Sequence, residues 1–175
     1  MPLIRTIALL EALKTRLCTY PLNEGGDVLD GRLFELVAYY ESNQLEKALR
    51  DLMANQHQRV CILVPSGHGY SNVRDREKNR LRKDVRLDVL VADRAYDAAS
   101  RAALVGAATN VGVVTMVDRI VDDLLTTPIP GFADVLFEPE DAAPLTLAEK
   151  PTDPGRLCWA LSLVTRAGGT LVAVP

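Results

Sequence analysis

The stretch RVCILVPSGHGYSN, residues 59–72, decides the fold class. Its apolar residues run into a proline and then into the Ser-Gly-His-Gly sequence of 66–69, which is how a phosphate-binding loop can begin. Such a loop holds phosphate only when the N-terminus of a helix follows and presents its free N–H groups. Here the charged segment VRDREKNRLRKD, residues 73–84, follows, so the sequence argues against a nucleotide site.

A second apolar segment lies beyond the charges and alternates with a period of two. The residues on its two sides are Val85, Leu87, Val89 and Val91 against Arg86, Asp88, Leu90 and Ala92. This period predicts a half-buried strand over 84–92, and 59–65 is the strand before it. The two strands are then joined by a long charged hairpin loop, 72–84. Gly67 and Gly69 lie before this loop and are interpreted as turn residues that tolerate positive φ.

The rest of the chain predicts helices around these two strands. Helical spacing of apolar residues predicts an N-terminal helix 3–17, a second helix within 42–56 and a long helix about 109–126. The segment 32–40 fits either a strand or a helix face. Further strands are expected at 133–138, 144–148 and 157–165. The sum is α+β: a single domain, 1–175, with a mostly antiparallel sheet packed against helices.

Composition excludes several classes of protein. A chain of 175 residues, 48% hydrophobic, has enough apolar residues for one core, and its net charge of −3 gives no general reason to bind nucleic acid. Cys18, Cys61 and Cys158 lie far apart and form no Cys-x-x-Cys pair, so we expect free thiols and neither a disulfide framework nor a zinc site. Charges interrupt the apolar residues of 1–17, which predicts a soluble protein made in a cytoplasm.

The search for catalytic residues finds two weak groups. Ser66 and His68 are near in sequence, but no Gly-x-Ser-x-Gly motif surrounds them. Asp84, Asp88 and Asp93 resemble a set of metal ligands, yet basic neighbours give a simpler interpretation, which is a solvated strand face. The sequence therefore predicts no enzyme, no cofactor and no metal.

The loop 72–84 is the most unusual segment. It carries six cations against three acids and has no apolar residue besides Val73 and Leu81. One interpretation is an exposed loop that its charges keep solvated, and the other is an arm that becomes ordered when it contacts a partner.

The order of four segments resembles the tail terminator proteins of long-tailed bacteriophages, including those of Mu-like prophages. These segments are LRKDVRLDVLVADR (81–94), VGVVTMVDRIVDDLLTTPIPGF (111–132), VLFEPEDAAPLTL (135–147) and the strand RLCWALSLVTR (156–166), which contains the tryptophan. The likeness covers roughly 45–166 and is one of layout, because the family has no catalytic motif.

Membership of that family would imply a small structural subunit of the virion, assembled in the host cytoplasm. Such subunits form a homohexameric ring on the head-proximal end of the tail tube, stop its growth and join it to the head-completion or neck protein. The implied partners are other copies of the chain, the tail tube protein and the neck protein. No membrane is involved, and DNA only passes through the lumen of the ring. The residues expected to contact a neighbouring subunit or the tube are Arg74, Arg76, Lys78, Arg80, Arg82, Lys83 and Trp159.

Two alternatives to a tail terminator stay open. One is another neck or connector subunit of a phage. The other is a small phosphate-ester or nucleotide hydrolase that uses the turn 65–70.

Overall fold

The computed structural model describes residues 5–41, 44–54, 57–75, 78–94, 111–129, 131–132, 135–145, 156–166 and 171–173. Within these ranges the elements, in chain order, are α1 (Thr6–Leu17), the 3-10 turn η1 (Val28–Asp30), β1 (Leu36–Tyr39), α2 (Leu45–Ala54), β2 (Arg59–Asp75), β3 (Lys78–Arg94), α4 (Val113–Thr126), β4 (Leu136–Pro144), β5 (Arg156–Arg166) and β6 (Leu171–Ala173).

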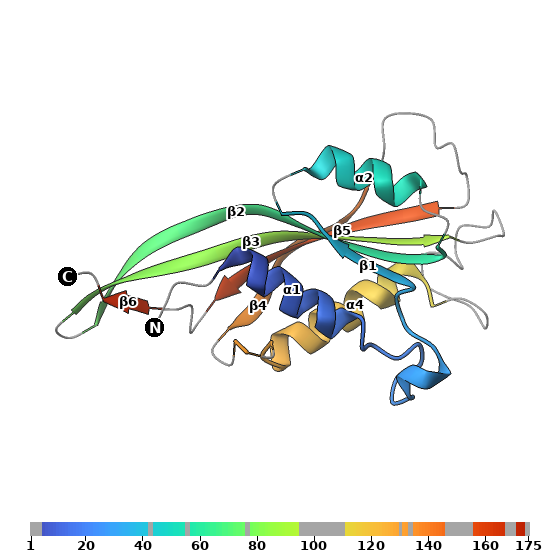
Figure 1. The fold of residues 1–175 in the computed structure, drawn as a ribbon, viewed down its shortest axis with the longest axis horizontal. Helices are drawn as coiled ribbons and strands as arrows, with labels where there is room; N and C mark the ends of the chain where they lie inside the picture. The colour runs from blue at the N-terminus through green and yellow to red at the C-terminus, as the bar shows by residue number, and fades with distance from the viewer. Residues whose placement is uncertain are drawn as a thin grey trace.

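These strands form one sheet in the order β1-β2-β3-β5-β4, with β6 paired to β3 (Figure 1). The pair β1–β2 is parallel and the other pairs are antiparallel. Helices pack against both faces of this sheet. The predicted α+β class, with a mostly antiparallel sheet, is therefore confirmed.

The larger core, called the main core here, lies between one face of the sheet and the helices α1 and α4. Helical spacing places the apolar residues of each helix on one side, so both helices bury a stripe against the sheet. The fully or nearly fully buried residues of this stripe are Leu9, Leu10, Leu13 and Leu17 in α1 and Val113, Met116, Ile120 and Leu124 in α4.

A second, smaller core lies on the opposite face under α2. Ala48 and Leu52 of α2 pack on the residues of β2 and β3 that alternate with those of the main core, including Ile62 and Leu90. Both faces of the central strands are thus buried, which explains why VCILV, residues 60–64, is apolar without interruption.

β2 contains a register shift between Pro65 and Gly67, so Ser66 is one extra residue in this strand. Before the shift, Cys61 and Leu63 lie on the main-core face. After it, His68 pairs with Val85, which lies in the main core. This is the geometry of a β-bulge, which keeps the two strands paired on both sides of the extra residue.

The structure corrects the predicted loop 72–84. β2 and β3 stay paired from Arg59↔Asp93 to Asp75↔Lys78, and only 76–77, which lie outside the described residues, separate them. The prediction was wrong because it required apolar alternation, whereas the main-chain hydrogen bonds that pair two strands are open to polar residues as well. Gly67 and Gly69 lie within β2, and neither is among the glycines with positive φ, so the predicted turn at 65–70 is also absent.

The other predicted elements differ from the structure mainly at their ends. α1 ends at Leu17, as predicted, but begins at Thr6, because Arg5 is extended and precedes the helix; residues 3 and 4 lie outside the described residues. α4 ends at Thr126 as expected but begins at Val113, because its N-cap, Gly112, has φ 83°. The ambiguous segment 32–40 contains the short strand β1. β4 extends to Pro144, and most of the strand expected at 144–148 lies outside the described residues.

Candidate interaction surface

The most prominent feature of the structure is a two-stranded ribbon, defined here as Gly67–Asp75 of β2 and Lys78–Arg86 of β3. The two segments pair without a break from Gly67↔Arg86 to Asp75↔Lys78. In Figure 1 they continue past the N-terminal end of α1 to the far left, and β6 is the one described element that lies beside them there. Val85 at its base lies in the main core, and from there the ribbon extends away from both cores of the domain.

The base of the ribbon is attached to the start of α1. The Nζ of Lys83 donates a hydrogen bond to the Oγ1 of Thr6 at 3.1 Å, and burial lowers the pKa of this lysine. His68 follows on the neighbouring strand, and its pKa is lowered first by partial burial and then by the charge of Lys83. Tyr70 pairs with Lys83 across the ladder and remains 60% exposed. An exposed aromatic residue beside two basic ones is a surface suited to contact with another protein.

The predicted contact residues fall into two places. Arg74, Lys78, Arg80 and Arg82 lie in the backbone ladder of the ribbon, whereas Arg76 lies outside the described residues. The structure thus brings the basic residues together along one element, as the sequence led us to expect, although that element is a pair of strands.

Trp159 lies apart from the ribbon, in β5. It pairs with Val91 of β3 on one side and Pro144 of β4 on the other, and its partly buried ring packs against the main core. Its Nε1 is buried and has no hydrogen-bond acceptor among the described residues. This residue belongs to the body of the domain.

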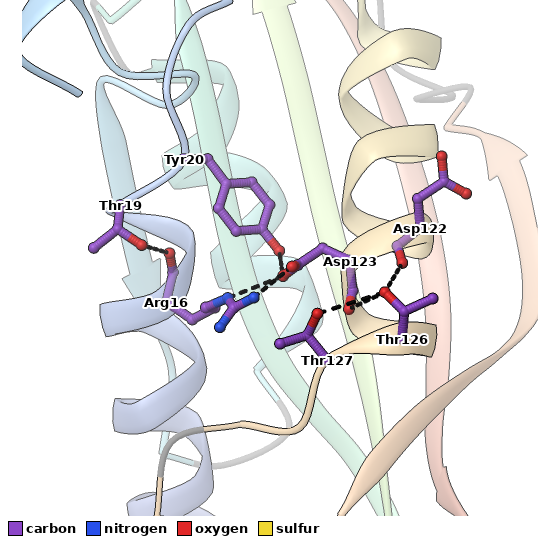
Figure 2. A network of polar contacts seen from close by, with 7 residues as sticks. All are labelled: Arg16, Thr19, Tyr20, Asp122, Asp123, Thr126 and Thr127. Carbon is purple, nitrogen blue, oxygen red and sulfur yellow. Dashed lines mark hydrogen bonds and ion pairs between the residues drawn. The ribbon is translucent and has the colours of Figure 1, made fainter. Parts of the chain in front are cut away.

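A polar network that the sequence did not indicate joins α1 to α4 (Figure 2). The guanidinium of Arg16 donates from Nε and Nη2 to the two carboxylate oxygens of Asp123, with Nε to Oδ2 at 3.0 Å, and the hydroxyl of Tyr20 donates to the same Oδ2. The bond to Asp123 raises the pKa of Arg16. Burial, and then the bond to Asp123, raises the pKa of Tyr20. No local motif indicates these residues, because each has other polar residues beside it in the sequence and nothing distinguishes it from them.

A shallow hollow of about 360 Å³ opens beside this network. Arg119 does not point a free charge into it, because its guanidinium donates to the main-chain oxygens of Pro21 at 2.8 Å and Leu22 at 2.9 Å. The hollow is lined by Tyr20, Pro21, Glu24, Arg119, Asp122 and Asp123. The contact of Arg16 holds the end of α1 against α4, and the contacts of Arg119 hold the segment after α1 against the same helix, so the arrangement acts as a structural clasp.

The residues considered for catalysis are placed in strands. Ser66 lies at the bulge and His68 lies two residues further along β2, so the turn that motivated a hydrolase is not formed. Asp88 accepts a hydrogen bond from Ser162 at 2.9 Å. Asp93 is fully buried and accepts from the N–H of Gly112 at 3.2 Å. The prediction of a solvated face was wrong for Asp93, because it lies beneath the N-terminus of α4, where a carboxylate is favoured.

Comparison with protein-family models and with curated proteins finds no match to this chain. Among the described residues, no group of three or more potential ligands is arranged to bind a metal ion. The helices in those same ranges are also too short or too polar to cross a membrane.

Proposed function

We propose that the protein is a structural subunit of a phage tail, a tail terminator that forms a ring on the head-proximal end of the tail tube and joins it to the neck. The observation that carries the proposal is the ribbon. A domain of this size does not need a pair of strands that continues past its helices for its own stability, and an element of this kind commonly contacts a partner.

The charge of the ribbon supports contact between copies of the chain. Residues 72–84 contribute +3 to a net charge of −3, so the remaining residues carry −6. A basic ribbon and an acidic body attract each other when one copy meets the next head to tail, and this kind of contact closes into a ring when the rotation allows it. The bound surfaces would be heterologous, as a ring requires.

The experiment is to determine the mass and shape of the purified protein. Light scattering after size exclusion, over a range of protein concentrations, and negative-stain images should show a ring, six-membered if the family resemblance holds. Raising the salt concentration should weaken assembly, because the Debye length falls from about 10 Å at 0.1 M to about 3 Å at 1 M.

A variant with a shortened ribbon provides the decisive comparison. Replacing 74–82 by a short Gly-Ser linker should leave the melting temperature of the body nearly unchanged, because both cores lie elsewhere, while rings disappear. Leu29→Ser is the matched control, since this side chain is 91% exposed at a separate projecting turn, and it should still form rings. A protein that remains monomeric at every concentration and salt would contradict the proposal.

A further inference from the structure

The outer edge of β2 is open along most of its length. β1 pairs with β2 only over Val60–Leu63, and the last main-chain bond of this pair joins the N–H of Tyr40 to the carbonyl of Leu63 at 3.0 Å. Among the described strands none pairs with this side of β2 beyond that point. The ribbon therefore has one edge, Gly67–Asp75, that none of the described strands covers.

This edge presents main-chain N–H and C=O groups that no described strand pairs. Residues of an antiparallel strand alternately direct their N–H and C=O groups toward the partner strand and away from it. β3 takes the inward groups of Gly67–Asp75, so the alternate residues present theirs outward. These groups are a template for one more extended strand.

The opposite edge of the sheet is protected, and the contrast is informative. β4 carries Pro139 and Pro144, which have no N–H to donate, and its register shifts between Pro139 and Asp141. Proline and bulges are the usual means by which a sheet prevents edge pairing. Gly67–Asp75 contains no proline and no register shift. One edge is blocked and the other is left able to pair.

We propose that the edge Gly67–Asp75 is where a neighbouring copy of this chain docks by adding an extended strand through main-chain hydrogen bonds. The identity of the partner rests on the proposed ring. A copy of the chain suits this edge as a partner, because the sheet carries a second edge that none of the other described strands covers, that of β6.

The ribbon itself offers a strand for this purpose. β6 pairs with β3 at Arg80–Arg82, and β2 pairs with the same residues through Ser71–Val73. At this level the ribbon is three-stranded, with β2 at one edge and β6 at the other. Copies related by rotation about a ring axis bring the β6 edge of one against the β2 edge of the next, and the two strands run parallel without refolding.

Two adjacent proline variants, Ser71→Pro and Asn72→Pro, test the proposal and control for each other. Neighbouring residues alternate in the direction of their N–H, so one variant removes a bond to β3 and the other removes only an outward donor. The melting temperature identifies which is which. The variant that keeps the wild-type melting temperature should have a dissociation constant for self-association that is higher by up to about tenfold, which is the effect of about one lost hydrogen bond. Wild-type association in that variant would overturn the proposal.

Hydrogen exchange on the wild-type protein gives a second readout that does not depend on a variant. The outward amides of Gly67–Asp75 should exchange rapidly in dilute subunits and become protected after assembly. No gain of protection in assembled protein overturns the edge proposal and leaves the proposed function intact. Absence of any assembly, by contrast, contradicts both.

Discussion

Asp123 shows how much of this domain depends on one polar side chain. Its carboxylate binds Tyr20 and Arg16, which lie 103 and 107 residues away in the sequence. The side chains of Arg16 and Asp123 are each 23% exposed, so solvent screens the attraction between their charges only in part. The network thereby fixes the end of α1 against α4 across the main core.

Asp123→Asn should lower the free energy of unfolding by about 1.5–3 kcal/mol, because the guanidinium and the phenol lose a charged acceptor. Urea titration at neutral pH measures the change. Asp122→Asn is the matched control, since this neighbour is exposed and should change stability by less than about 0.5 kcal/mol. Equal effects of the two substitutions would show that the network is not a clasp.

Tyr20→Phe should change how stability depends on alkaline pH. The pKa of Tyr20 is raised in the folded protein, so its hydroxyl stays protonated there, whereas the unfolded chain ionises near its ordinary pKa of about 10. Its contribution is complete below that pH and is lost as the pH rises further. Unfolding from pH 8 to 11 should therefore show a smaller alkaline loss for Tyr20→Phe than for the wild type. Parallel curves would contradict this coupling, and the other tyrosines cancel because both proteins contain them.

At the scale of elements, β5 holds the centre of the second half of the sheet, between β3 and β4. Its alternation was predictable: Leu161 and Leu163 lie in the main core, and Cys158 lies on the opposite face in the smaller one. Trp159 follows the same alternation and packs against the main core, partly exposed.

Trp159→Ala should destabilise the domain by about 3 kcal/mol, the low end of the range for truncating a large aromatic residue, because the ring is only partly buried. Trp159→Phe keeps an aromatic ring at the site and should cost clearly less. Thermal unfolding of the two variants measures both effects. An alanine variant that melts like the wild type would mean that the ring contributes nothing to the core.

The sequence predicted those elements whose side chains have a regular apolar period. α2, α4 and β5 belong to this group, and their positions are confirmed apart from a few terminal residues. The ribbon was missed as a pair of strands because its ladder depends on main-chain bonds, which leave no period in the sequence. The clasp was missed because Asp123 lies more than 100 residues from Arg16 and Tyr20 in the sequence, and only the folded chain brings them together.

At the scale of the whole molecule, the sheet separates two cores of unequal size and the ribbon extends from its middle strands. β2 and β3 contribute to both cores and then to the ribbon, so the same two strands hold the domain together and form its proposed contact surface. A partner that binds the ribbon would therefore be connected directly to the rigid centre of the domain. Such continuity suits a subunit that must transmit position from one copy to the next.

The extra residue Ser66 affects the direction in which the ribbon leaves the domain but does not affect which residues of β2 and β3 pair. A bulge bends its strand and increases the local twist, while the pairs on either side, Pro65↔Leu87 and Gly67↔Arg86, stay in register with β3. Deleting Ser66 would straighten the strand without changing any pair beyond it. In the proposed ring, the angle at which one subunit meets another, and with it the curvature of the ring, could thus vary through a single position while the proposed contact surface stays the same.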